Sequence, residues 1–266
     1  MTNIEFDEWL KTRPRYKPLD KWKPYLIPEI IDRHPTINNK MHAFISRIIT
    51  GEMGHGKSMF AYKLMAKLDY HLNGYTTIDQ EENSYKFALD NMVYHPEDLF
   101  ARFDRTLNSD YPDWIWTLDD ASIHMGKQLW NQDREAYWKL EDKIPTIREN
   151  VTCLLITTPK LNALAKPFRD FFDKKIKITL EEGVKRYPRR AKHYFKDYYP
   201  DDVHYCIHHP FDDKFSCLVP DPFYKWYRDK KKKALREYDE RKKNRPEKKY
   251  KSSPEGEEET EVDKGD

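Results

Sequence analysis

Short apolar runs alternate with longer stretches of helical periodicity from about residue 41 to residue 180. The runs that we interpret as strands are 43–50, 91–94, 114–118, 151–157 and 176–180. Helices are expected between them, at 57–72, from 95 to about 107, at roughly 123–142 and near 161–171. Strands that alternate with helices are typical of a parallel sheet covered by helices. The pattern therefore predicts an α/β fold in which 176–180 closes the sheet.

The segments on either side of this core differ from it in composition. Residues 1–40 are rich in Pro, Lys and Trp, and two short helices expected at 4–11 and 19–33 either brace the core or contact a partner. The next segment alternates without helical period, which indicates a β-rich extension. A basic helix follows it, and the acidic tail is expected to be disordered. The predicted units are 1–40, 41–182, 183–222, 223–250 and 251–266.

A glycine-rich loop joins the first predicted strand to the first predicted helix. It reads Gly51-Glu52-Met53-Gly54-His55-Gly56-Lys57-Ser58, the G-x4-G-K-S pattern of the phosphate-binding P-loop in its strand–loop–helix context. Glycines let successive N–H groups turn toward phosphate oxygens, and the helix N-terminus adds partial positive charge. Lys57 can reach the β- and γ-phosphates, and the Ser58 hydroxyl can hold Mg²⁺. The loop therefore predicts binding of ATP and Mg²⁺; the alternative is a glycine-rich turn that binds nothing.

A pair of carboxylates follows the strand 114–118. Because this apolar strand ends in Asp119 and Asp120, both acids are expected at the C-terminal edge of the sheet, where ligands of open α/β sheets bind. Asp119 would hold the Mg²⁺ shell, mostly through water, and Asp120 would polarise the attacking water. The alternative is a strand that ends in an Asp-Asp helix cap. After a P-loop at this distance, we favour the catalytic interpretation.

Two further elements complete the candidate site. The buried strand 151–157 ends in hydroxyls, and Thr157 or Thr158 is able to bond the γ-phosphate or the catalytic water; Thr158 is the candidate that we carry forward. Arg169 precedes the last core strand and can project into a neighbouring subunit's site to stabilise transition-state charge. The alternatives are a plain threonine turn and a surface arginine paired with an aspartate.

Taken in this order, these elements resemble the ASCE class of P-loop ATPases over about residues 41–180. The resemblance implies a RecA-like parallel sheet sandwiched by helices, with the β-rich extension and the C-terminal basic helix added. The chain is most similar to the small DnaA-like or FtsK/HerA-like ATPases encoded by archaeal viruses and plasmids. Their "LPD-x-x-Y" ending resembles the segment from Leu218 to Tyr224, in which Val219 is inserted before the Pro-Asp pair.

The resemblance implies an ATP-hydrolysing motor or initiator that acts on DNA, in the host cytoplasm if it is encoded by a virus or plasmid. It also implies a site shared between the subunits of a ring, hexameric in its working form. The sequence departs from the class at Asp120, where the usual residue is the longer Glu, so water activation is expected to be slower or to fall to another residue. No helical lid follows 176–180, which suits the RecA- and FtsK-like branch.

Basic segments are the candidate nucleic-acid surface. Residues 185–196 interleave cations with aromatic rings, a composition that can neutralise phosphates and stack bases. The segment 223–250 carries 13 basic against 5 acidic residues, and a solvated helix is its leading interpretation. No helix-turn-helix or zinc-finger signature is present, so DNA contact is not expected to be sequence-specific.

Cysteine and histidine residues leave one metal hypothesis open. His204, Cys206 and His208 share one face if their segment is a strand, and Cys217 on a paired strand is the candidate fourth ligand of a zinc site; aromatic strand packing is the default interpretation. The chain's three cysteines form no CxxC, and its N-terminus lacks signal-peptide features, so an intracellular, reduced protein is expected. No run approaches about 20 apolar residues, which excludes a membrane helix.

Two other function classes compete with a DNA motor. A small-molecule phosphotransferase has the same loop, but nucleotide kinases generally lack the strand between the P-loop strand and the acid-ended strand, and the run 91–94 argues against them. A nucleotide-binding structural or assembly protein with weak hydrolysis is kept open by Asp120.

Overall fold

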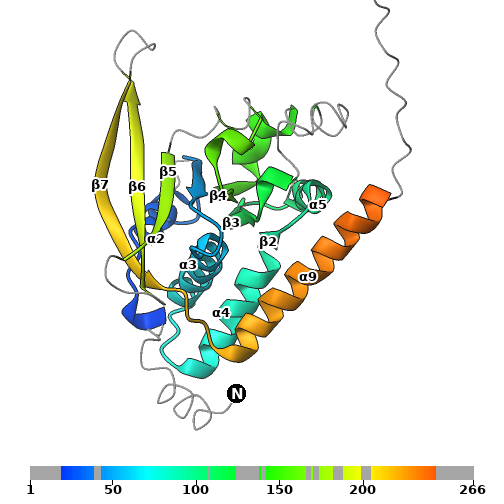
Figure 1. Cartoon of the computed structure of the whole chain (residues 1–266). Coiled ribbons are helices and arrows are strands. Elements are labelled where there is room, and N and C mark those ends of the chain that lie inside the picture. Colours follow the sequence, from blue (N-terminus) through cyan, green and yellow to red (C-terminus); the bar gives the residue numbers. More distant parts are fainter. Residues whose placement is uncertain are drawn as a thin grey trace, which may run out of the picture.

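One sheet of seven strands organises the chain, in the order β2-β3-β4-β1-β5-β6-β7 (Figure 1). The structure is a computed structural model that describes residues 19–38, 43–106, 108–123, 138, 142–165, 169, 174–181, 188–198 and 205–243. The strands are β1 (Ile45–Thr50), β2 (Met92–Val93), β3 (Asp113–Leu118), β4 (Val151–Thr157), β5 (Lys174–Leu180), β6 (Pro188–Tyr198) and β7 (Tyr205–Ser216). The predicted mixed α/β fold with a mainly parallel sheet is confirmed.

The strands from β2 to β5 pair in parallel, so their carboxyl ends share one edge of the sheet. The strand that lies between the P-loop strand β1 and the acid-ended strand β3 is β4. Residues 91–94, which we expected to supply an intervening strand, instead contain the short strand β2 at the border of the sheet, paired with β3. The argument against a nucleotide kinase therefore rests on β4.

The sheet does not close at 176–180. Beyond β5 it continues into β6 and β7, which pair antiparallel over most of their length. The expected β-strands of 183–222 are present, but they extend the core sheet because Ile176 and Ile178 of β5 pair directly with His193 and Ala191 of β6. The prediction that 176–180 is the last core strand was wrong. Polar and apolar residues alternate in β6 and β7, and this pattern did not reveal that one face of each strand is buried against the core.

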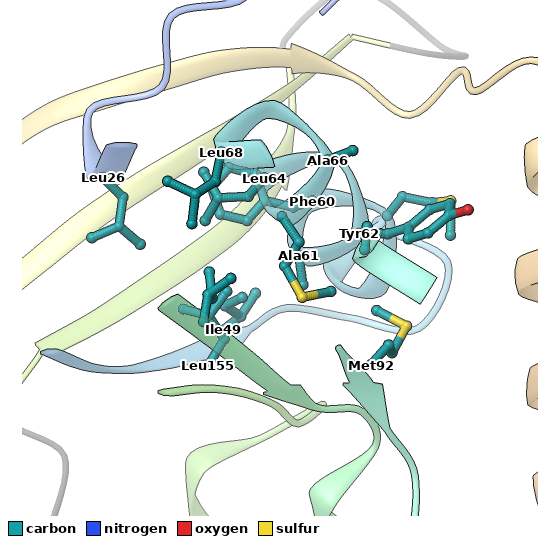
Figure 2. Packing of buried hydrophobic residues seen from close by; sticks show 14 of the residues in the cluster. Leu26, Ile49, Phe60, Ala61, Tyr62, Leu64, Ala66, Leu68, Met92 and Leu155 are labelled. Atoms are coloured by element: carbon teal, nitrogen blue, oxygen red, sulfur yellow. The ribbon is translucent and has the colours of Figure 1, made fainter. Parts of the chain in front are cut away.

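Helix α3 (Lys57–Leu72) lies at the centre of the larger apolar core and is buried around most of its circumference. Figure 2 shows its side chains between Ile49 of β1 and Leu155 of β4 on one side and Leu26 on another. The helix matches its predicted bounds. A helix that is buried on nearly every side is enclosed by other elements, and here these are the sheet, α2 (Leu26–Arg33), α4 (Ile78–Asp90) and the 3₁₀ turn η1 (Leu19–Lys21).

The opposite face of the parallel strands has its own core. Ile48, Leu154 and Ile156 pack there against residues of α5 (Pro96–Thr106) and of the 3₁₀ helix η3 (Ile144–Glu149). The helix expected from 95 to about 107 is thus confirmed as α5. Most of the helix expected at 123–142 lies outside the described residues, apart from the 3₁₀ turn η2 (Ala121–Ile123) and a few positions near its end.

Helix α4 was not predicted. Its buried face carries Glu81 and Ser84 beside Tyr85 and Ala88, and the two polar residues interrupt the apolar periodicity. Glu81 is buried because its Oε1 accepts the Leu19 N–H at 2.9 Å. A signal was available, since Thr77 and Gln80 form a capping box, the pattern that marks a helix start.

The remaining segments differ from expectation in detail. The helix expected at 19–33 is divided into η1 and α2, and the one expected at 4–11 lies outside the described residues. Near 161–171, the described part holds the 3₁₀ turn η4 (Leu161–Ala163). The basic segment forms α9 (Asp221–Lys243), which runs past α4 and β2 toward α5 (Figure 1). The predicted unit boundaries stay predictions.

Candidate nucleotide site

The P-loop backbone adopts conformations that only glycine allows at two crowded positions. Gly56 has φ +93° and caps α3, and a Cβ there would lie 2.2 Å from the Cys217 Sγ. Gly51 has φ +149°, and a Cβ there would lie 2.6 Å from the Ile178 carbonyl oxygen. Side chains are therefore excluded both by backbone strain and by contact with β5 and the segment after β7. The loop is a backbone cradle at the N-terminus of a helix.

Lys57 lies inside the curve of this loop. Its Nζ donates to the Gly51 carbonyl at 2.9 Å and to the Glu52 carbonyl at 3.0 Å. Burial lowers the pKa of the ammonium, while the nearby Asp120 and Asp119 carboxylates act in the opposite direction. The lysine therefore lies within electrostatic range of both acids, which brings the P-loop cation and the acid pair into one site.

Strand β6 supports the loop from outside. Arg189 is buried, and its Nε–H donates to the His55 carbonyl at 3.1 Å. Beside it, burial raises the pKa of the Cys217 thiol. The region around Arg189 was predicted to contact nucleic acid, but this arginine bonds the backbone of the P-loop. No motif marks such a contact, because it joins residues far apart in the sequence.

Asp119 and Asp120 lie at the C-terminal edge of the sheet and share one hydroxyl. Thr157 Oγ1 donates to Asp119 Oδ1 at 2.6 Å and accepts the Asp120 N–H at 2.8 Å. Asp119 is 1% exposed, and Asp120 has φ +52°. A left-handed aspartate is strained by about 1–3 kcal/mol, and such strain is concentrated at functional sites.

Of the two threonines weighed from the sequence, Thr157 is the one that contacts the acids. Thr158 is also buried, but its hydroxyl donates to the Lys160 carbonyl at 3.1 Å, within its own turn. Arg169 has a helical backbone, and its N–H bonds the Ala165 carbonyl. Neighbouring residues 166–168 and 170–173 lie outside the described residues. The catalytic roles of Thr158 and Arg169 stay predictions.

Helix α9 contributes a lysine to the acid pair that the sequence analysis missed. The Lys231 Nζ lies 3.0 Å from Asp119 Oδ2 and 2.6 Å from Asp120 Oδ2. Burial acts to lower the pKa of Lys231, but the carboxylates of Asp119 and Asp120 act the other way, and the net shift is upward. The sequence offered no signal, because Lys231 belongs to a run of four lysines and is 112 residues from Asp119.

A tyrosine on the same face of α9 also contacts the acid pair. The Tyr227 hydroxyl donates to Asp119 Oδ2 at 3.5 Å. Burial, followed by the Asp119 carboxylate, raises the pKa of this phenol. Tyr227 thus places the buried part of α9 next to the first acid.

The donor set fits a nucleotide with a hard divalent cation. Ser58 and Asp119 supply hydroxyl and carboxylate oxygens, the ligands that Mg²⁺ prefers. The buried Asp119 already faces positive charge from Lys231, which shows that the position holds a cation. Gly51 and Gly56 fix the loop backbone at the N-terminus of α3, where backbone N–H groups favour a bound anion. No group of three or more potential metal-binding side chains occurs among the described residues.

The zinc hypothesis loses its fourth ligand. Cys206 Sγ and His208 Nε2 lie 2.9 Å apart, and His204 is outside the described residues. Cys217 lies against Gly56 of the P-loop, where its Sγ is 4.0 Å from the His55 carbonyl oxygen. It is therefore packed into the nucleotide site.

One face of β5 and β6 is basic. Ile176 and Ile178 of β5 point into the core that contains α3, so the alternate residues Lys175 and Lys177 lie on the other face. Lys177 is opposite Lys192 of β6. Burial lowers the pKa of Lys175, and the neighbouring ammonium groups of Lys177 and Lys196 add to that effect. Within the described chain, no carboxylate lies within 4.0 Å of the ammonium groups of Lys175, Lys177 or Lys192.

Comparison with known proteins gives distant similarity. No known family profile matches the chain. Protein B-251 of Sulfolobus spindle-shape virus 1, which is uncharacterised, is 30% identical over 171 residues, or 62% of this chain. The matched region spans 61% of that relative's length.

Three solved structures are also similar. The N-terminal domain of zonular occludens toxin from Neisseria meningitidis has 12% identity and a TM-score of 0.40, over 69% of this chain and 98% of that one. The KaiC-like protein PH0186 from Pyrococcus horikoshii OT3 has 13% identity and a TM-score of 0.34, over 62% and 89%. The flagellar accessory protein FlaH from Methanocaldococcus jannaschii has 10% identity and a TM-score of 0.30, over 66% and 90%. The fold assignment rests on the sheet order. Among the described helices, none has the length and apolar character needed to cross a membrane.

Proposed function

We propose that the chain is a Mg²⁺-dependent ATPase that acts on DNA. The observation that carries the proposal is the arrangement at one sheet edge: the P-loop follows β1 and the acid pair follows β3 at the shared carboxyl edge of the parallel strands, and Thr157 of β4 bonds both acids there. A phosphate cradle and a buried acid pair that share an edge are the two parts that nucleoside-triphosphate hydrolysis needs.

In this proposal, each residue has a distinct role. The P-loop amides and Lys57 hold the phosphate chain, while Ser58 and Asp119 hold Mg²⁺, which supplies positive charge to the β- and γ-phosphates. Asp120 accepts a proton from a water whose oxygen attacks the γ-phosphorus, and the bond to the bridging oxygen breaks to give ADP and phosphate. Thr157 is added to the predicted set, because its hydroxyl fixes both acids.

The test is ATP hydrolysis with and without DNA, with Lys57→Ala as the inactive control. DNA-stimulated turnover that is lost in Lys57→Ala supports the motor. Phosphate transfer to a nucleoside monophosphate would instead identify a kinase. A second candidate, a nucleotide-binding assembly protein with weak hydrolysis, is favoured by the ion pairs of Lys231 with both acids. Binding of ATP without turnover, with or without DNA, would select it.

The basic face of β5 and β6 is the DNA surface in this proposal. Lys175, Lys177 and Lys192 offer a row of ammonium groups, and Tyr194 supplies an aromatic ring 5.1 Å from the Lys175 Nζ. Such a surface neutralises phosphates without reading sequence. The double variant Lys177→Glu/Lys192→Glu should weaken DNA binding and reduce its salt dependence. Lys86→Glu, at a lysine of α4 paired with Glu82 and away from this face, is the control.

The proposal of a site shared between the subunits of a ring rests on the position of Arg169, which is the last described residue before β5. Arg169→Ala should abolish hydrolysis while ATP affinity is retained, because a residue supplied by a neighbour stabilises only the transition state. Unchanged turnover would remove the trans-acting role. Sizing in the presence of ATP then tests whether the working form is a hexamer.

A further inference from the structure

Helix α9 lies across the acid pair and is anchored from Phe223 to Ala234. Phe223, Tyr227 and Ala234 are buried in the main core, whereas Leu235, on another face of the helix, is 41% exposed. Within this stretch, the Lys230 Nζ donates to the Leu89 and Met92 carbonyls. The start of α9 is thus anchored by aromatic packing. Further along, the contact of His95 Nε2 with Glu237 Oε2 is longer, at 3.7 Å.

Within this anchored stretch of α9, Lys231 is the residue that contacts Asp119 and Asp120. One ammonium group serves both carboxylates, through Asp119 Oδ2 at 3.0 Å and Asp120 Oδ2 at 2.6 Å. The adjoining cavity, lined by Tyr94, Leu235 and Tyr238 among others, has a volume of about 10 Å³. That is room for about one water molecule, so it does not hold the hydration shell of a second cation.

We propose that Lys231 occupies the cation position of the acid pair, so that α9 is an autoinhibitory arm whose lysine must leave before Mg²⁺-nucleotide engages. The inference rests on the proposed function, because it assigns regulation to the same site. It also gives a physical role to the ion pairs that otherwise favour an inactive assembly protein.

Charge and geometry explain why the two cations exclude each other. Thr157 donates to Asp119 Oδ1, and the Lys231 ammonium lies against Oδ2, so a cation that binds Oδ2 must take the place of Lys231. A short charge-assisted hydrogen bond also holds the Asp120 oxygen that would accept a proton from water. A divalent ion placed beside Lys231 would in addition be repelled by it across a site that excludes water.

Release is compatible with the rest of the fold. Tyr227, one helical turn before Lys231, is fixed in the core and keeps α9 attached while the lysine moves. The displaced ammonium is one of four successive lysines, and Lys232 and Lys233 are already exposed. A bound polyanion would therefore stabilise the released arm.

The first experiment titrates Mg²⁺ against binding of a fluorescent ATP analogue to the full chain. In Lys231→Met, the Mg²⁺ concentration for half-maximal binding should fall by about tenfold, the contribution of a charge-assisted hydrogen bond. Basal hydrolysis should rise. Lys232→Met, which removes the same charge from an exposed neighbour, should match the wild type. Suppose that Lys231→Met melts like the wild type but needs more Mg²⁺, or hydrolyses ATP more slowly. That result would contradict the autoinhibitory role and would show that Lys231 contributes to catalysis.

The second experiment needs no variant. Hydrogen exchange of the wild type should become faster in residues 235–243, beyond the buried Ala234, when Mg²⁺ and the analogue are added, and unchanged or slower exchange there would count against the proposal. Failure of the proposed function is distinguishable from failure of the arm. If neither wild type nor Lys231→Met retains the analogue at any Mg²⁺ concentration, the nucleotide site itself is wrong.

Discussion

The two halves of the candidate site are built in different ways. The P-loop is a run of eight residues whose shape is set by its own glycines and by the start of α3. The acid pair instead depends on Thr157, 38 residues from Asp119, and on Lys231, 112 residues from it. Phosphate binding uses backbone N–H groups, which a local sequence can orient. Holding two carboxylates together requires side chains with opposite charge or with donors, and these come from any part of the chain that the fold brings near.

The contrast is incomplete, because the P-loop also rests on distant residues. Ile178 and Cys217 limit the space at two glycines, and Arg189 bonds the His55 carbonyl. The loop therefore has a local conformation and a tertiary support. The variants below separate these two contributions, beginning with the largest expected effect.

Gly56→Ala should reduce nucleotide affinity about a hundredfold or more and lower the free energy of unfolding by about 1–3 kcal/mol. The added Cβ meets both the positive φ and the Cys217 Sγ at 2.2 Å. Analogue binding and urea denaturation measure the two effects. Gly54→Ala is the matched control, since its φ is +80° but nothing lies within 4 Å of the new Cβ. Equal stability losses in the two variants would mean that Cys217 does not shape the loop.

Thr157→Val should lower turnover about ten- to a hundredfold, because it removes a hydrogen bond to a charged carboxylate and leaves the Asp120 N–H unpaired. Valine has the same shape, so strand β4 is preserved. Steady-state ATP hydrolysis is the measurement. Thr158→Val should have a much smaller effect; if it proves the more damaging of the two, the role returns to Thr158 as the sequence analysis had it.

Arg189→Met should weaken nucleotide binding by about five- to tenfold, the value of one hydrogen bond from a charged donor to the P-loop. Arg190→Met changes the neighbouring arginine, which pairs with Asp212, and should leave affinity unchanged. Calorimetric titration with a non-hydrolysable analogue distinguishes them. If nucleotide affinity is unchanged in Arg189→Met, the conformation of the P-loop depends on its own residues alone.

Tyr227→Phe should have the smallest effect, a change of about threefold or less in Mg²⁺ dependence, because its bond to Asp119 is long at 3.5 Å. The aromatic packing with Tyr62 remains. The measurement is the Mg²⁺ titration used for Lys231→Met. A Tyr227→Phe effect as large as that of Lys231→Met would show that the phenol, more than the ammonium, controls the acids.

The sequence predicted those parts of the fold in which burial of apolar residues is the dominant force. Strands with two buried faces, such as β4, and the fully enclosed helix α3 matched their predicted bounds because apolar runs mark them directly. The elements that were missed or misplaced have polar residues on buried faces. In α4, Glu81 is buried for a bond to Leu19, and in β6, His193 is buried beside Asp213. Hydrophobic patterning does not reveal such buried polar residues, because their burial is explained only once the hydrogen-bond partner is known.

The sequence by itself determined the P-loop, the position of the acid pair at a strand end and the parallel α/β core. These depend on local backbone conformation and on apolar periodicity, which nearby residues set. The tertiary structure alone decided that Thr157 joins the acids, that Arg189 supports the loop and that α9 places Lys231 between two carboxylates. A charged side chain can pair with any residue that the fold brings near it. Its role therefore depends on tertiary contacts and not on the residues next to it in the sequence.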